Sequence, residues 1–344
     1  MKTKSLAADE RPENLWAVIL AGEDGAGLQA GACAGPARPS DGPLDDSLLR
    51  RTLDRALLAV PEKRTVLVAD PQRDLRRAPG FPLPAAHAPR LVLRPPHPGA
   101  ATDILLAVHW IRRQQADATV VILPAEQAVP EPLAFIRHVL AVAAFIERHT
   151  REIVIVGARA TDSGAGCGWI ETSQPIPDVR SAAVWRVRSL RRSAPGTSAR
   201  SGGSAWLRST SVIVARADAL IEASQRYAPE LDAMLETASV LLGTRYERRS
   251  VAECHAVARD ARLVDVLRAG GNRLLSASRL PPARRSDRAD AARWTGWPPA
   301  PRGRFDGLVE QHSLQDNVEA CLAGTVSPWL PWKAKPYTEI TRKP

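Results

Sequence analysis

The sequence predicts an α/β fold in which a mostly parallel, mixed β-sheet carries helices on both of its faces. Short apolar runs with the length of buried strands alternate with longer segments whose apolar residues recur at helical spacing. The first apolar run, residues 15–21, stops at a glycine-rich loop, as phosphate-binding α/β proteins often begin. In such sheets ligands bind at the carboxyl ends of the strands.

The alternation is regular over the first half of the chain. Apolar runs predict strands at residues 15–21, 64–69, 90–93, 118–123 and 152–157. Helical spacing of apolar residues predicts helices at residues 48–60, 102–115 and 132–148, and Asp46-Ser47 can cap the first of them. Prolines at positions 95, 96 and 98 follow the predicted strand at 90–93, and the proline at 124 ends the predicted strand at 118–123.

The pattern changes after residue 157. Strands of an antiparallel addition are expected at residues 167–170 and 182–187, and a further strand at 211–215. Helices are expected at residues 217–227 and 229–242, with a short one near 314–322. We therefore divide the chain into a polar tail (1–14), one α/β domain (15–280) and a Pro/Arg-rich region of poor order (281–344).

Composition narrows the class of protein. An apolar fraction of 44% over 344 residues is enough for a sizeable core, and no apolar run approaches the roughly 20 residues that span a bilayer. The first residues lack the apolar centre of a signal peptide, and the four cysteines form no C-x-x-C pair. We expect a soluble, cytoplasmic protein without a membrane partner, a disulfide framework or a zinc site.

The net charge of +10 comes from arginine, and residues 186–304 contain no lysine. A basic segment can attract nucleic acid or other polyanions. Arginine, alanine and proline are abundant throughout, however, which also fits a general composition bias. Aromatic residues are not interleaved with the arginines as stacking platforms would require, so nucleic acid is the less favoured partner.

Five stretches, in the right order, resemble the nucleotide-sugar pyrophosphorylases, and most closely the mannose-1-phosphate guanylyltransferases. The similar stretches are the opening strand and glycine-rich signature (16–28), the first helix (47–56), the turn and helix at 97–107, the L-P-A-D-H strand (120–127) and the G-Y-G-[YW]-I segment (166–171). The resemblance covers residues 15–171 and is fainter to about 243. It implies a Rossmann-like sheet of the nucleotide-diphospho-sugar transferase type.

The resemblance also implies a reaction. In this family a sugar-1-phosphate oxygen attacks the α-phosphorus of a nucleoside triphosphate, and pyrophosphate leaves. For the guanylyltransferases the substrates are GTP and mannose-1-phosphate, and the product is GDP-mannose. No protein nucleophile is required, because Mg²⁺ and basic side chains position the phosphates and neutralise their charge.

The family's phosphate-binding residues are largely replaced. Gly22 and Gly25 persist and are the candidate nucleotide-binding glycines, but Gly27 stands at the family's arginine and Ala37 at its lysine. No catalytic residue can therefore be assigned. Arg38, next to the lysine position, is a candidate substitute on the nucleotide. Glu23 and Ala26 stand where the family loop has glycine and threonine.

The metal and sugar positions are altered as well. The L-P-A-D-H aspartate is Glu126, a carboxylate that could still hold Mg²⁺ if the protein is active. Gly168 and Trp169 persist in the G-Y-G-W-I segment and are the candidate sugar-binding residues, although for Trp169 packing is favoured over sugar contact. The family's W-N-x motif reads Arg208-Ser209-Thr210.

Scaffold features survive while ligand-binding features change together, so we interpret the chain as a degenerate member of the family. The first hypothesis is a mannose-1-phosphate guanylyltransferase-type protein with weak or lost activity. The alternative is a pseudoenzyme that senses a nucleotide or nucleotide sugar, or that serves as a partner subunit. A polyanion-binding protein is the third.

Two further features are considered as sites. Cys254 and His255 are adjacent in the sequence, and helical neighbours point about 100° apart, so they do not form a nucleophile–base pair. A basic face of Arg245, Arg248 and Arg249 is interpreted as solvated.

Overall fold

The computed structural model describes residues 12–21, 46–69, 90–93, 100–125, 129, 131–159, 168–178, 182–191, 206–258, 263–269 and 275–280. The strands in these ranges are β1 (Leu15–Ala21), β2 (Thr65–Ala69), β3 (Arg90–Leu93), β4 (Thr119–Pro124), β5 (Ile153–Arg159), β6 (Trp169–Ile176), β7 (Val184–Arg191), β8 (Trp206–Arg216) and β9 (Leu275–Arg279). The α-helices are α1 (Asp46–Leu57), α2 (Ala100–Gln114), α3 (Pro132–Arg148), α4 (Ala217–Tyr227), α5 (Pro229–Leu241), α6 (Glu247–Val257) and α7 (Leu263–Ala269), and a 3-10 turn covers Glu62–Arg64.

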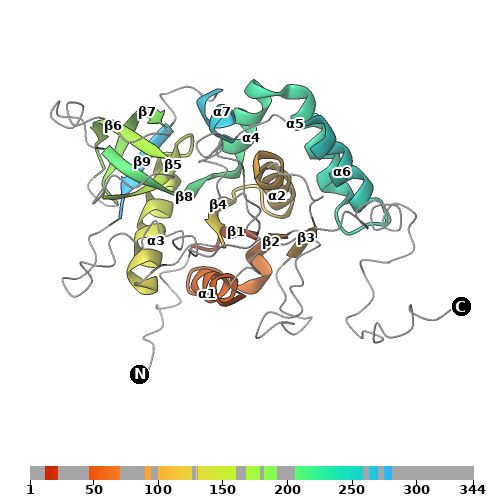
Figure 1. Cartoon of the computed structure of the whole chain (residues 1–344), viewed down its shortest axis with the longest axis horizontal. Helices are drawn as coiled ribbons and strands as arrows, with labels where there is room; N and C mark the ends of the chain where they lie inside the picture. Colours follow the sequence, from red (N-terminus) through yellow and green to blue (C-terminus); the bar gives the residue numbers. More distant parts are fainter. Residues whose placement is uncertain are drawn as a thin grey trace, which may run out of the picture.

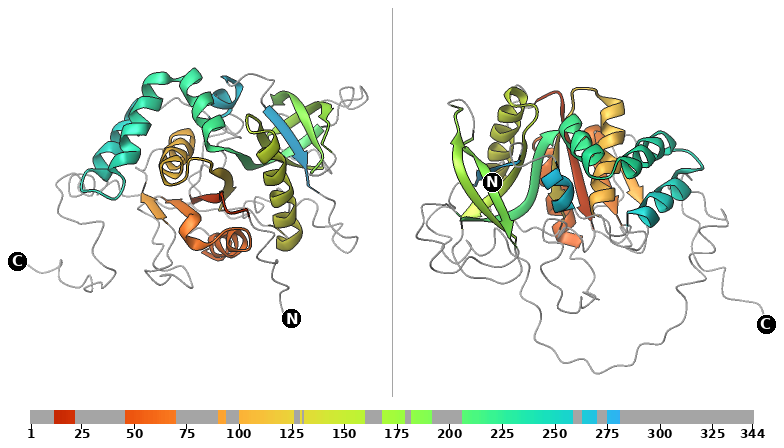
Figure 2. Two further views of the ribbon diagram at one scale, coloured as in Figure 1. Left: turned by 180° about the vertical axis from the view of Figure 1, so that it is seen from behind. Right: turned by 90° about the horizontal axis from the view of Figure 1, so that it is seen from above.

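All nine strands belong to one sheet, in the order β3-β2-β1-β4-β8-β5-β9-β7-β6. The first four strands are parallel, and β8 then runs antiparallel to both β4 and β5. An additional pairing of β8 with β6 joins β8, β5, β9, β7 and β6 into a closed ring. Figure 2, viewed from above, shows these strands beside the flatter parallel part.

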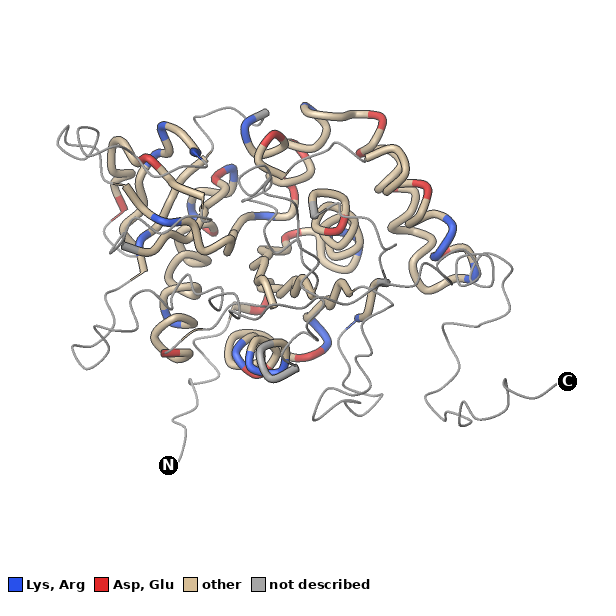
Figure 3. Tube along the Cα trace, in the orientation of Figure 1, with Lys and Arg blue, Asp and Glu red and all other residues tan. Residues whose placement is uncertain are grey.

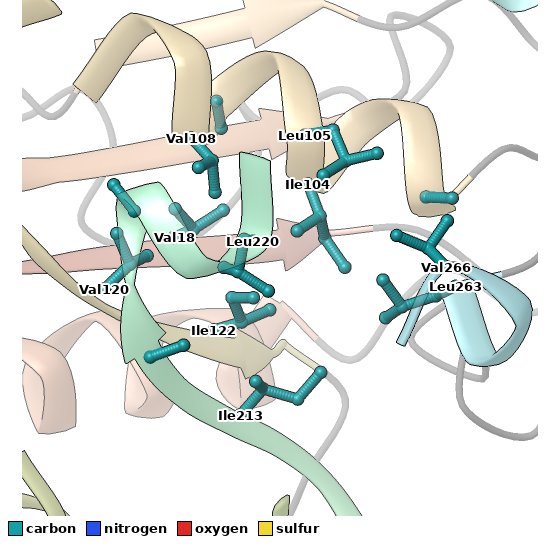
Figure 4. Packing of buried hydrophobic residues seen from close by; sticks show 14 of the residues in the cluster. Val18, Ile104, Leu105, Val108, Val120, Ile122, Ile213, Leu220, Leu263 and Val266 are labelled. Atoms are coloured by element: carbon teal, nitrogen blue, oxygen red, sulfur yellow. The ribbon is translucent and has the colours of Figure 1, made fainter. Parts of the chain in front are cut away.

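The core lies on both faces of the parallel strands. Alternate residues of β1 point in opposite directions, so Leu15, Ala17 and Ile19 join the cluster that contains α1 and α3. Trp16, Val18 and Leu20 join the cluster that contains α2 and α4 to α7. Figure 1 shows α1 below these strands and α2 above them. The second cluster is drawn in Figure 4, with Val18, Val120, Ile122 and Ile213 from strands facing Ile104, Leu105, Val108, Leu220, Leu263 and Val266 from helices.

Buried polar pairs fasten α2 to the helices above it. His109 Nε2 lies 2.9 Å from Asp232 Oδ1 of α5, and Asp103 Oδ1 lies 3.0 Å from His255 Nε2 of α6. At the edge of the sheet Arg90 of β3 pairs with Glu247 at 2.8 Å, and this carboxylate also accepts a hydrogen bond from the Gly243 amide. The helical layer is thus joined to the sheet by charges as well as by apolar contacts.

The expected α/β class, with helices on both faces, is confirmed. The predicted antiparallel addition is confirmed by the pairing of β6 with β7. The expectation of a Rossmann-like, mostly parallel mixed sheet holds only as far as β4, because β8 is antiparallel to both β4 and β5. Beyond it β5, β9, β7 and β6 close with β8 into the ring. Antiparallel pairings consequently outnumber parallel ones.

Three elements were not predicted: α6, α7 and β9. The predicted tail (1–14, apart from residues 12–14), the predicted 314–322 helix and the 281–344 region lie outside the described residues. The division into three regions stays a prediction. Within the described ranges no helix combines the length and apolar character needed to cross a membrane.

Candidate functional site

The four parallel strands, β3, β2, β1 and β4, end at one level, and this common end gives the position of the candidate site. Ala21 of β1 is level with Ala69 of β2, Ala69 with Leu93 of β3, and Leu20 with Pro124 of β4. The chain leaves the sheet after each of these residues on the same edge, the carboxyl edge. Ligands of such sheets bind at this edge, since the connections that follow the strands gather there.

The ends of β1 and β4 are fixed to each other and to α1. The Ala125 amide donates to Leu20 O at 2.9 Å, directly before the positions of Gly22 and Glu126 in the sequence. Thr52 Oγ1 of α1 donates to Ala125 O at 3.1 Å. Three elements therefore meet where the β1 and β4 chains leave the sheet.

A buried arginine extends this arrangement. Arg55 is 2% exposed, its Nη2 donates to Thr52 Oγ1 at 3.0 Å, and its guanidinium lies 5.2 Å from the centre of the Phe135 ring of α3. Burial lowers the pKa of Arg55 to about 10, so the side chain stays cationic at neutral pH. The carboxyl edge thus has a fixed positive charge beneath it.

The polar half of β8 lies on the same side of the sheet. Ile122 and Ile213 are the last paired positions of β4 and β8, and beyond them residues 207–209 of β8 pair with residues 157–159 of β5. The Ser209 amide donates to Gly168 O at 2.8 Å, and Trp169 is level with Arg208. The structure therefore brings the candidate sugar-binding segment together with the segment aligned to the W-N-x motif.

A bulge shapes this part of β8. The register with β5 shifts between Val156 and Gly157, and Thr210 Oγ1 donates to Val156 O at 2.7 Å. Ser211 has a φ of 59°, a left-handed conformation that costs a residue with a Cβ about 1 kcal/mol. Its Oγ is buried and has no hydrogen-bond partner within the described part of the chain. The bulge is a strained position where the polar residues 208–211 of β8 meet its apolar residues 212–215.

Trp169 belongs to the packed interior, since its side chain is 1% exposed. Two residues later Glu171 is buried, accepts a hydrogen bond from Ser189 Oγ at 2.7 Å, and lies 3.9 Å from Arg191. Arg191 in turn lies over the Trp206 ring at 5.2 Å. Of the two candidate sugar-binding residues, Gly168 accepts the hydrogen bond from the Ser209 amide at its backbone carbonyl, and Trp169 packs its side chain in the interior.

The other candidate residues fall outside the described ranges: Gly22, Gly25, Gly27, Ala37, Arg38 and Glu126. Among the residues that the structure describes, no three His, Cys, Asp or Glu side chains are grouped as metal ligands. A Mg²⁺ site thus stays a prediction based on Glu126. Thr52, Arg55 and the Ser211 bulge were missed; the available signal was a polar pair at i, i+3 spacing that interrupts the apolar face of α1.

The two dismissed features can now be placed. Cys254 is 1% exposed, and burial raises the pKa of its thiol to about 11, while His255 faces Asp103. Cys254 is therefore an inert packing residue, as expected. The basic face was only partly predicted, because Arg245 and Arg249 are exposed but Arg248 is half-buried with its Nη1 atom covered.

The fold has known counterparts among solved structures. A mannose-1-phosphate geranyltransferase from Thermus thermophilus is 22% identical, with a TM-score of 0.56 over 78% of this chain and 74% of that chain. A mannose-6-phosphate isomerase from Helicobacter pylori is 13% identical, with a TM-score of 0.54 over 78% of this chain and 97% of the other.

The chain shares its fold with these two solved structures. No protein-family model matches the sequence, and no curated protein matches it either. This shared architecture agrees, at the level of the fold alone, with the resemblance drawn from the five sequence stretches.

Proposed function

We propose that this chain binds a nucleotide or nucleotide sugar at the carboxyl edge of β1 and β4, as a protein of the mannose-1-phosphate guanylyltransferase type whose catalytic activity is weak or lost. The observation that carries the proposal is the edge itself. The ends of β1 and β4 are joined through Ala125 and Leu20, and a buried cation, Arg55, lies beneath them. In parallel α/β sheets ligands bind at this edge, where the connections that follow the strands gather.

The choice of mannose phosphate as the sugar rests on three supports. Both solved structures described above carry mannose phosphates in their names. The sequence stretches resemble the guanylyltransferases more closely than other pyrophosphorylases. Gly168 lies beside Ser209, which groups the candidate sugar segment with the polar part of β8.

Weak or lost activity is proposed from the residues at the family's phosphate positions. Gly27 and Ala37 replace an arginine and a lysine, so two charge-assisted contacts to phosphate are removed. Glu23 adds a negative charge to the same loop. The loss of one preorganised donor costs about 10²–10³ in rate in other enzymes. If activity persists, Mg²⁺ is the proposed cofactor, with Glu126 as a ligand.

Isothermal titration calorimetry with GTP and with GDP-mannose tests the binding proposal. We expect saturable binding of at least one of them by the full chain, with inorganic sulfate as the control for a non-specific anion effect. An absence of heat with both nucleotides, or equal binding of sulfate, contradicts it.

The second candidate function, a sensor or partner subunit without catalysis, uses the same site. It predicts nucleotide binding without pyrophosphate release at any substrate concentration. The polyanion hypothesis has weaker support, because the described arginines of β7 lie near carboxylates: Arg186 pairs with Glu152 at 2.5 Å, and Arg191 lies near Glu171. Figure 3 shows blue and red positions side by side around these strands.

A further inference from the structure

The buried face of α1 carries two polar side chains that packing alone does not require. Leu49, Leu53 and Ala56 of this helix pack in the core, as an amphipathic helix predicts. Thr52 and Arg55 lie among them and are 0% and 2% exposed. Both point toward the end of β4, since Arg55 Nη2 donates to Thr52 Oγ1 and that hydroxyl donates to Ala125 O.

A buried cation is an expensive way to stabilise a fold. Taking a guanidinium out of water costs several kcal/mol, which its hydrogen bonds and other contacts must offset. Arg55 lies against the Phe135 ring, itself 0% exposed, and its Nη2 atom donates to Thr52 Oγ1. The hydrogen bond to Thr52 is a contact that an apolar side chain at this position cannot make.

The hydrogen bonds indicate what the charge does. A cationic donor polarises the Thr52 hydroxyl and strengthens the bond that this hydroxyl gives to Ala125 O. The amide of Ala125 donates to Leu20 O, so the same peptide segment is held from α1 and from β1. Ala125 directly precedes Glu126, and Leu20 lies two residues before Gly22.

We propose that Thr52 and Arg55 are positioning residues: they fix the chain after β4 in register with the end of β1, and ligand binding at the carboxyl edge depends on that register. The proposal rests on the proposed function for the identity of the ligand. Neither residue needs to touch the nucleotide, since both act through Ala125.

The test compares three variants with one control. Thr52→Val removes the hydroxyl at nearly constant shape, Thr52→Ser keeps it, and Arg55→Met replaces the cation by an apolar side chain of similar length. Arg51→Gln, on the exposed face of the same helix, is the control for loss of charge. The readouts are GTP affinity by calorimetry, amide hydrogen exchange of residues 119–125, and the urea midpoint of unfolding.

We expect Thr52→Val to weaken GTP binding about tenfold, the equivalent of one lost hydrogen bond, and Thr52→Ser to restore it to within about threefold. Arg55→Met should weaken binding at least about tenfold, because it removes the donor to Thr52 Oγ1. Exchange in residues 119–125 should be faster in Thr52→Val and Arg55→Met, but unchanged in residues 65–69 of β2. Arg51→Gln should match the wild type throughout.

The proposal is overturned if Thr52→Val and Arg55→Met bind GTP like the wild type, or if Thr52→Ser binds as weakly as Thr52→Val. Should Arg55→Met fail to fold, the two Thr52 variants decide. Should the wild-type chain bind neither GTP nor GDP-mannose, the proposed function fails, and exchange in residues 119–125 decides the positioning role. An unchanged exchange rate in Thr52→Val then overturns it.

Discussion

His109 and Asp232 are 123 positions apart in the sequence, yet their side chains meet at 2.9 Å between α2 and α5 and are 6% and 4% exposed. Burial raises the pKa of the Asp232 carboxyl, but hydrogen bonds from His109 and Ser224 lower it by more, so the pKa lies below its ordinary value. The carboxylate therefore stabilises the folded state in its charged form.

Replacing Asp232 by Asn should lower the free energy of unfolding by about 2–3 kcal/mol, because it removes a buried carboxylate that accepts hydrogen bonds from His109 and Ser224. Urea denaturation at pH 7 measures this. Asp218→Asn is the control: Asp218 is exposed and pairs with Arg112 on the surface, so its loss should cost less than about 1 kcal/mol. Equal, small effects in the two variants would show that the buried pair contributes little.

The same pair sets an acid limit. A carboxyl whose pKa is depressed by folding contributes stability above its unfolded pKa and loses that contribution as the pH falls through the folded pKa. The wild-type chain should therefore lose more stability below about pH 4 than Asp232→Asn does. Urea midpoints measured at pH 7 and pH 3 provide the comparison, and parallel losses in the two proteins would contradict the assignment.

Ser211→Gly should stabilise the protein by about 0.5–1 kcal/mol, since glycine adopts a φ of 59° without the cost that a Cβ adds. Ser211→Ala is the matched variant that removes the hydroxyl but keeps the Cβ. Thermal unfolding should rank glycine above serine and alanine. A Ser211→Gly variant less stable than the wild type would mean that the hydroxyl, rather than the backbone, determines this position.

His138 predicts a second pH dependence, which comes from a buried histidine rather than from a hydrogen-bonded carboxylate. It lies on α3, contacts Ser278 Oγ at 3.1 Å, and burial lowers its pKa to about 4. Between about pH 6.5 and pH 4 the unfolded chain binds a proton that the folded chain does not, so stability falls as the pH falls. His138→Gln should lose about 2 kcal/mol less than the wild type between pH 7 and pH 4.5.

Measurements at pH 8 provide the control for that variant. The histidine is then neutral in both the folded and the unfolded chain, so the stabilities of the wild type and His138→Gln should differ only by the change in packing. If the pH profiles of the two proteins run parallel from pH 8 to pH 4.5, another group causes the acid loss.

The sequence predicted the part of the fold that has strong periodicity. The strands β1 to β5 and the helices α1 to α3 are long apolar or amphipathic runs, and their observed bounds lie close to the expected ones. β9 was missed because Ser276 and Ser278 interrupt it, although both are 0% exposed. α6 was missed because charged residues fill its first turn and only Val251 and Cys254 among its apolar residues are fully buried.

The candidate site divides in the same way. Local signals located the ends of β1 and β4, since a strand that stops at glycine or proline is visible in the sequence. The relation of Arg55 to Ala125 depends on how α1 docks on the sheet, and the pairing of His109 with Asp232 depends on how α5 docks on α2. Such contacts join residues that are far apart in the sequence, so no periodic pattern of the sequence predicts them.

Cys254 should resist thiol reagents in the native protein. Its side chain is buried and burial raises its pKa to about 11, so the thiolate is scarce at neutral pH. A chain with Cys33, Cys167 and Cys321 replaced by Ser should react slowly with Ellman's reagent until urea unfolds it. Rapid reaction of the folded variant would contradict the interior position of Cys254.

The central claim is that the chain keeps a nucleotide site and has lost the residues that give this family rapid nucleotidyl transfer. Release of pyrophosphate from GTP with mannose-1-phosphate and Mg²⁺ tests it most directly. The account predicts that the triple variant Glu23→Gly, Gly27→Arg and Ala37→Lys releases pyrophosphate at least about 100-fold faster than the wild type. A wild-type rate equal to or above that of the triple variant would contradict it.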